Sequence, residues 1–85
     1  MKAVDRELRL RHLTVDEALF RLDQYLNDAF MAGLPSVRIV HGKGTGTLRQ
    51  AVHEVLAKHP LVKSFRPGDY GEGDYGVTIV ELVHR

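Results

Sequence analysis

The chain of 85 residues contains neither cysteine nor tryptophan, and its aromatic residues amount to 7%. Without cysteine it can form neither a disulfide nor a thiolate metal site, and its other residues show no spacing typical of metal ligands. No apolar run approaches the roughly 20 residues of a membrane span. Charged residues, not an apolar segment, follow Met1-Lys2-Ala3, so we expect no signal peptide. The absences predict a cytoplasmic domain without membrane association or cofactor, with any need for a divalent metal left open.

The chain also has little excess charge of one sign, because 12 Lys and Arg against 11 Asp and Glu give a net charge of +1. This balance argues against a uniformly basic nucleic-acid binder, but the distribution of charge matters more than its sum. The cations gather early, at Arg6, Arg9, Arg11, Arg38, Lys43 and Arg49. Acidic residues gather late, at Asp69, Glu72, Asp74 and Glu81. A nearly neutral chain of this kind can therefore present a basic face.

The first half of the chain predicts a strand, a helix and a second strand. Residues 7–11 alternate strictly between charged and apolar side chains, as in a strand with one face toward solvent. Thr14 and Glu17 have the spacing of a capping box, and apolar residues then recur at helical spacing until Gly33 ends the helix. The apolar run 37–40 is typical of a buried strand.

The second half predicts a helix over 48–56, closed by His59-Pro60, and strands over 61–65 and 76–83, joined by a glycine-rich loop. The order β-α-β-α-β-β implies parallel strands with right-handed crossovers, followed by a hairpin. The expected fold is an α/β two-layer sandwich, in which a four-stranded mixed sheet carries two helices on one face. Residues 1–6 are expected to be a linker or a remnant of truncation, and residues 7–85 the domain.

The most informative segment lies between the second strand and the second helix and reads His41-Gly42-Lys43-Gly44-Thr45-Gly46-Thr47-Leu48-Arg49. Glycines let the backbone approach a ligand, and the amides that begin a helix attract anions. The spacing is neither that of a P-loop nor that of a Rossmann fingerprint. Because so short a chain hardly builds a cleft for a free nucleotide, we interpret the turn as a site for backbone phosphates of DNA or RNA. The alternative is a flexible turn without a ligand.

Three further groups of residues are candidates for a site. Arg9 and Arg11 point the same way from a strand and could follow a phosphate backbone, or could form a solvated face paired with Glu7 or Glu81. His12 and His41 follow the first and second strands, where the sites of α/β proteins gather. The imidazole of His41 permits acid–base chemistry, or it is a hydrogen-bonding turn residue. Tyr70 and Tyr75 could stack on bases, although we favour an anchoring role for them.

Three segments make the chain resemble the Smr (small MutS-related) domain family, and more narrowly the C-terminal Smr domain of second-type MutS proteins. The turn 41–49 matches the family's His-Gly-x-Gly-x-Gly block, 13–19 matches the start of its first helix, and 76–82 matches the ending of those chains. The likeness covers residues 7–83. It implies a fold like the C-terminal domain of a translation initiation factor and a position downstream of ATPase domains.

The resemblance also implies a nucleic-acid-binding domain that is often a nicking endonuclease of weak sequence preference, acting in recombination suppression or DNA repair. Arg9 stands where the family has an acid implicated in cleavage, and His12 stands where it has glycine. A guanidinium cannot act as a base or a metal ligand. The alternative is therefore a non-catalytic module that binds branched DNA or, in ribosome rescue, ribosomal RNA.

The candidate site residues follow from the turn and from the resemblance together. Those expected to act in catalysis are His41, Lys43 and Arg11. Those expected to bind nucleic acid are Arg9, Arg11, His12, Gly42, Lys43, Gly44, Thr45, Gly46 and Arg49. In this reading Lys43, Arg11 and the turn amides stabilise charge at the scissile phosphate.

Overall fold

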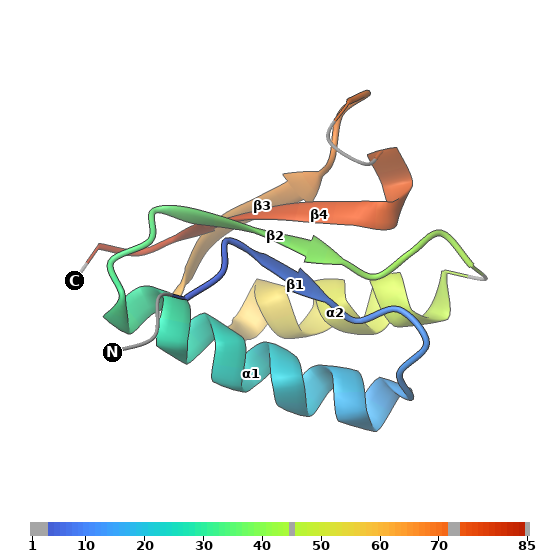
Figure 1. Ribbon diagram of the computed structural model, residues 1–85, viewed down its shortest axis with the longest axis horizontal. Helices are drawn as coiled ribbons and strands as arrows, with labels where there is room; N and C mark the ends of the chain where they lie inside the picture. Colours follow the sequence, from blue (N-terminus) through green and yellow to red (C-terminus); the bar gives the residue numbers. More distant parts are fainter. Residues whose placement is uncertain (1–3, 45, 72–73, 85) are drawn as a thin grey trace.

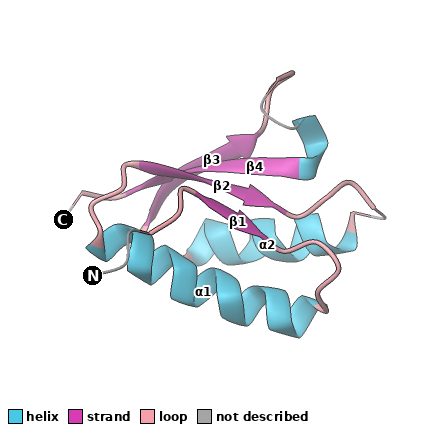
Figure 2. Ribbon diagram, viewed as in Figure 1, coloured by secondary structure: helices cyan, strands magenta, loops and turns pink. Residues whose placement is uncertain are grey.

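A computed structural model describes residues 4–44, 46–71 and 74–84. The elements follow one another as β1 (Glu7–Arg9), α1 (Val15–Met31), β2 (Ser36–Val40), α2 (Thr47–Lys58), β3 (Val62–Pro67), the short 3₁₀ helix η1 (Asp74–Gly76) and β4 (Val77–Leu82). Figure 1 shows both helices on one face of the four-stranded sheet, and Figure 2 shows the two layers by colour. The predicted α/β sandwich is therefore confirmed. Among the described residues, no helix is long and apolar enough to cross a membrane.

The strands lie in the order β1-β2-β4-β3. β1 pairs with β2 in parallel, whereas β4 is antiparallel to both of its neighbours, β2 and β3. The predicted final hairpin is thus present, but its second strand enters between β2 and β3 and separates them. The first residues of β4 consequently lie beside the last residues of β2, with Val77 opposite Val40.

The ends of β1 and β3 each differ by two residues from the sequence prediction. β1 ends at Arg9 and not at residue 11, because the chain turns at Arg11 and His12. Leu10 still donates its amide to the Val40 carbonyl (2.7 Å), and its side chain is fully buried. β3 runs two residues further than predicted, to Pro67, and η1 was not predicted. Its three residues form one turn, too short to leave a periodic pattern in the sequence.

Both ends of α1 carry the signals read from the sequence. Thr14 Oγ1 accepts the amide of Glu17 at 3.2 Å, as an N-cap does. At the other end Gly33 has a φ of 78°. Its amide donates to the Phe30 carbonyl, and the amide of Leu34 donates to the Ala29 carbonyl, each at 3.0 Å. These two bonds form a Schellman motif, which satisfies carbonyls that the helix itself leaves open.

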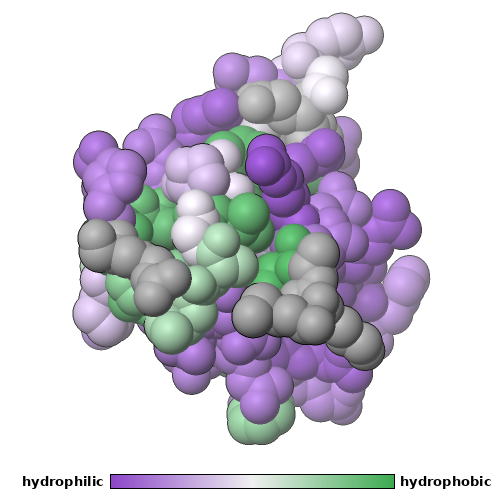
Figure 3. All heavy atoms as spheres, turned by 60° about the vertical axis from the view of Figure 1, so that its left-hand side comes forward, coloured by the Kyte–Doolittle hydropathy of each residue, from purple (hydrophilic) through white to green (hydrophobic). Residues whose placement is uncertain are grey.

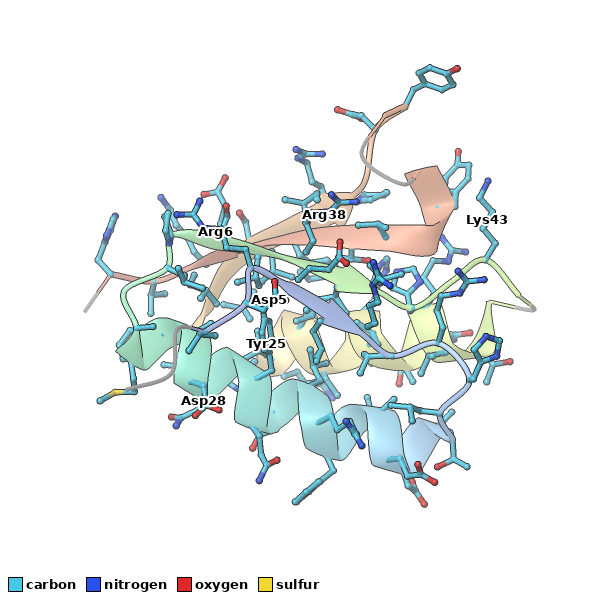
Figure 4. The ribbon with its side chains drawn as sticks, in the orientation of Figure 1. Asp5, Arg6, Tyr25, Asp28, Arg38 and Lys43 are labelled. Carbon is cyan, nitrogen blue, oxygen red and sulfur yellow. The ribbon has the colours of Figure 1, made fainter. Side chains whose placement is uncertain are left out.

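The core lies between the sheet and the two helices. It is built from apolar side chains of both helices, of β2 and β4, and of the residue that follows β1, namely Leu10, Ala18, Leu22, Tyr25, Leu26, Ala29, Val37, Ile39, Val52, Leu56, Val80 and Leu82. Burial raises the pKa of Tyr25 to about 12, and its hydroxyl donates to the carbonyl of Asp5 (Figure 4). Residues 4–6, assigned to a linker from the sequence, thus contact the domain. Val4 packs against the core, and the Arg6 carbonyl accepts the Arg38 amide at 2.8 Å.

The two ends of the molecule differ in character. Figure 3 shows the end that carries both termini, where apolar atoms gather in the middle of the face and hydrophilic residues surround them. The carboxyl ends of β1 and β2 and the amino ends of both helices lie at the opposite end (Figure 1). Helix amino ends attract negative charge, so this second end is where an anion is expected.

Replacing Gly33 with alanine should destabilise the domain by about 1 kcal/mol, because an L residue is strained at a positive φ. A Cβ there would meet no other atom within 4 Å, so the cost would come from the backbone alone. Urea unfolding measures it. Gly33→Asn is the matched control, since asparagine tolerates this conformation better. Equal stability of the alanine variant and the wild type would contradict the left-handed conformation of Gly33.

Candidate nucleic-acid interface

The turn that follows β2 is held by one carbonyl. The amides of His41 and Gly42 both donate to the carbonyl oxygen of Gly76, at 3.1 and 2.9 Å. Gly42, Gly44 and Gly46 all have positive φ values, of 81°, 35° and 87°. The alternating glycines are therefore required by the backbone conformation itself. The evidence for a ligand has to come from the charged groups around the turn.

The amino end of α2 is arranged differently from that of α1. Gly46 is the N-cap of α2 and offers no side-chain cap, and the first turn contains no acidic residue. α1 is capped by Thr14 and carries Asp16 and Glu17 in its first turn. Both helix ends line one hollow, which the turn completes. An anion in this hollow would therefore be attracted to the amino end of α2, whose positive dipole no carboxylate of the first turn offsets.

Three cations from different segments surround the turn. A Cβ on Gly42 would lie 3.4 Å from Arg11 Cγ, so the stem of Arg11 covers that glycine. The stem of Lys43 covers Gly76 in the same way, at 3.5 Å, and Figure 4 shows Lys43 extending outward. The guanidinium of Arg49 lies 5.9 Å from the centre of the Tyr75 ring. The structure thus brings Arg11, Lys43 and Arg49 together.

Arg9 and His12 lie around a neighbouring hollow, which Arg11 also lines. Arg9 Nε is 2.9 Å from a carboxylate oxygen of Glu7, and Arg38 Nε approaches the other oxygen at 3.7 Å. Figure 4 shows Arg38 on the sheet face turned away from the helices. The pairing of Arg9 with Glu7 matches the solvated-face reading of the sequence. Because the Arg9 side chain is 79% exposed, this ion pair contributes little to stability.

His12 has a φ of 69° and is the one non-glycine residue with positive φ in the described part of the chain. This left-handed conformation favours glycine, because a Cβ crowds the backbone there. The resemblance read from the sequence implies glycine at this position, so the substitution by His12 falls on a strained backbone. Thr45, the remaining predicted binding residue of the turn, lies outside the described residues.

His41 is buried, with 5% of its surface exposed. Its Nδ1 lies 2.9 Å from the Gly42 carbonyl oxygen, and its Nε2 lies 2.8 Å from the hydroxyl of Thr78. The same hydroxyl lies 2.7 Å from Nε2 of His53. Burial lowers the pKa of His41, with a further lowering by nearby Arg49, although its bond to Gly42 acts in the opposite direction. Both ring nitrogens of His41 are therefore bonded within the protein, and burial disfavours the charged form of the imidazole.

Thr78 and His53 were not predicted from the sequence as functional residues. Thr78 is fully buried and is the one polar residue facing the core from the apolar strand β4, which is the signal that could have singled it out. His53 packs against Phe65, with ring centres 5.2 Å apart. Burial lowers the pKa of His53 as well, and His41 and Arg49 lower it further.

The tyrosines of the loop before β4 behave differently. Tyr70 is fully exposed, and Tyr75 is 61% exposed with its ring against Arg49. The contact of Tyr75 agrees with the anchoring role favoured from the sequence, whereas the full exposure of Tyr70 contradicts that role for its ring. The described residues contain no group of three or more His, Cys, Asp or Glu side chains that could hold a metal ion.

These features define a small α/β domain that gathers cations at the amino end of a helix. The family model of the Smr domain matches residues 8–83, and the chain belongs to this family. The chain is 61% identical over 79 residues to the endonuclease MutS2 of Thermomicrobium roseum. These residues make up 93% of this chain and 10% of that protein. It is 58% identical over 81 residues to the endonuclease MutS2 of Caldicellulosiruptor saccharolyticus, and the matched residues make up 95% of this chain and 10% of that protein.

The Smr domain of Thermus thermophilus MutS2 has the same fold in its crystal structure. It is 49% identical, with a TM-score of 0.90 over 93% of this chain and 99% of that one. The resemblance read from the sequence motifs is therefore confirmed. The chain spans about a tenth of the length of the curated relatives.

The lowered pKa values of His41 and His53 predict a stability that depends on pH. Both groups are neutral in the folded state and take up protons on unfolding below the ordinary value of 6.5. The free energy of unfolding should thus be full above pH 6.5 and should fall as the pH drops toward the lowered folded-state values. Urea unfolding between about pH 7.5 and 5.5 measures it. His53→Gln should flatten the dependence, and an unchanged slope would contradict the role given to His53.

Proposed function

We propose that this domain binds the backbone phosphates of nucleic acid at the end of the molecule that carries the turn 41–49, here called the turn end. We propose further that it nicks DNA as part of a longer MutS-type protein. The observation that carries the proposal is the placement of Arg11, Lys43 and Arg49 around the turn that leads into α2. Similar proteins named endonuclease support the step from binding to cleavage. In the parent chain, recombination suppression or DNA repair is the setting that fits this activity.

Phosphate binding at the turn end follows from how the cations are held. The aliphatic stems of Arg11 and Lys43 lie on glycines, while the side chains end near the surface. Stems held in this way lose less conformational entropy when a phosphate binds. Contacts to phosphate position a protein on nucleic acid without reading its sequence, which agrees with a weak sequence preference.

Cleavage needs stabilisation of the negative charge that develops at the scissile phosphate. Lys43, Arg11 and the amides that begin α2 supply positive charge and N–H donors for this purpose. In this proposal His41 holds the turn and does not exchange a proton with the substrate, because both of its ring nitrogens are bonded within the protein. A divalent metal supplied from solution is a further component that the cleavage assay includes.

A second candidate function is binding without cleavage, with branched DNA or ribosomal RNA as the ligand. The observation that favours it is Arg9, whose guanidinium occupies the strand position where the family has a carboxylate. The Glu7 carboxylate two residues earlier is engaged by Arg9 and Arg38. The two functions share the phosphate contacts and differ in whether a phosphodiester bond is broken.

Lys43→Ala should weaken binding to duplex DNA at every sequence, and the slope of log affinity against log salt should fall by about one. The reason is the loss of one phosphate contact. Fluorescence anisotropy over a salt series measures it. Lys58→Ala is the matched control, because Lys58 is an exposed lysine at the other end of α2 and should leave the slope unchanged. An equal slope for Lys43→Ala and the wild type would remove the turn from the interface.

Nicking of supercoiled plasmid, with and without Mg²⁺, decides between the two functions. If the domain cleaves, open circles should form, and Lys43→Ala should abolish them. Arg9→Asp restores the carboxylate that the family has and should raise the cleavage rate if only this group is missing. Intact plasmid with a salt-sensitive gel shift would establish the binding module, and no gain from Arg9→Asp would mean that other groups carry the chemistry.

A further inference from the structure

A chain of hydrogen bonds runs under the turn, from α2 through β4 to the end of β2. It joins His53 Nε2, Thr78 Oγ1 and His41 Nε2, and it continues from His41 Nδ1 to the Gly42 carbonyl. The distances lie between 2.7 and 2.9 Å. Thr78 is fully buried, so its hydroxyl depends on these partners. His41 and His53 also meet edge to face, with ring centres 6.0 Å apart.

The direction of every bond in this chain follows from one acceptor. A carbonyl oxygen can only accept, so Nδ1 of His41 carries the proton that is donated to Gly42. In a neutral imidazole Nε2 is then an acceptor, and the Thr78 hydroxyl donates to it. Having used its proton, Thr78 Oγ1 accepts from His53, whose Nε2 must therefore carry a proton. Only one pair of neutral tautomers satisfies the whole chain.

The last bond of the chain orients the turn. The carbonyl and the following amide of a trans peptide point in opposite directions. Because the Gly42 carbonyl is drawn toward the buried imidazole, the amide of Lys43 points away from it. The peptide that precedes the central cation of the turn is thereby fixed.

We propose that Thr78 and His53 are positioning residues of the turn, which hold His41 in the tautomer with a proton on Nδ1 and so fix the Gly42–Lys43 peptide. This inference rests on the proposed phosphate-binding function for its consequence. Neither residue touches nucleic acid in the proposal. Their effect on binding passes through His41 and is specific to the turn.

The test uses Thr78→Val, which removes the hydroxyl and keeps the shape, beside Thr78→Ser, which keeps the hydroxyl. NMR spectra of the ¹⁵N-labelled domain report the tautomers of both histidines and the amide signals of Gly42 and Lys43. The wild type should show protons on Nδ1 of His41 and Nε2 of His53. Thr78→Val should shift the His41 tautomer and both amide signals, and Thr78→Ser should restore them. A wild-type His41 with its proton on Nε2 would overturn the proposal.

Affinity for a short DNA duplex gives the functional readout. Thr78→Val should weaken binding about fivefold, the effect of losing one ordering hydrogen bond, and serine should recover it. In a Lys43→Ala background the same substitution should have almost no further effect, because the turn has already lost its cation. Losses that add independently, or that serine leaves unrepaired, would show a merely structural role and overturn the proposal.

A second pair of variants covers the case in which Thr78→Val does not fold. His53→Gln keeps an N–H donor for the threonine and should resemble the wild type, whereas His53→Leu should shift the His41 tautomer. If no variant changes the His41 signals, the proposal is wrong. If the wild type binds no DNA, the proposed function fails, and the tautomer and amide signals still decide whether these residues position the turn.

Discussion

The pairing of β4 with β2 is the constraint on which the rest of the structure depends. It sets Thr78 opposite Ile39 and Val77 opposite Val40, so the segment that leads into β4 reaches the end of β2. The Gly76 carbonyl can then accept two amides of the turn, and Thr78 can reach His41. A strand order with β3 beside β2 would have placed other backbone groups there. The insertion of one strand thus supplies the turn with both of its anchors.

Features that depend on residues close in the sequence, such as the ends of a helix, were predicted from the sequence. Features that depend on the pairing of distant strands were not. Thr14, Gly33 and the helical spacing of α1 correctly predicted that helix, since caps and periodicity act within a few residues. The strand order did not follow, because contacts between distant segments leave no periodic trace. The same reason hid Thr78 and His53, which are 25 residues apart in the chain and meet only through the fold. Arg11, Lys43 and Arg49 could be singled out as candidates because each lies in or beside a recognisable motif.

The electric field around the domain depends on which charged side chains form ion pairs as well as on where the cations lie. Arg9 and Arg38 share the carboxylate of Glu7, so part of the basic charge seen in the sequence is neutralised on the open sheet face. At the turn the amino end of α2 adds its own positive dipole, and its first turn contains no acidic residue. A chain with a net charge of +1 can therefore concentrate an anion-attracting field at one end.

The retention of polar groups beneath the turn also has an energetic reason. Replacing His41 alone with an apolar residue would leave the buried Thr78 hydroxyl with one partner fewer and the Gly42 carbonyl without its imidazole donor. Such losses cost about 1–3 kcal/mol per buried group, whereas replacing a whole network by apolar groups can be nearly neutral. Stability alone thus does not require the histidines and the threonine. What the network adds is a defined orientation of the Gly42–Lys43 peptide, in a segment whose glycines would otherwise permit several orientations. The proposed phosphate binding at the turn rests on that orientation.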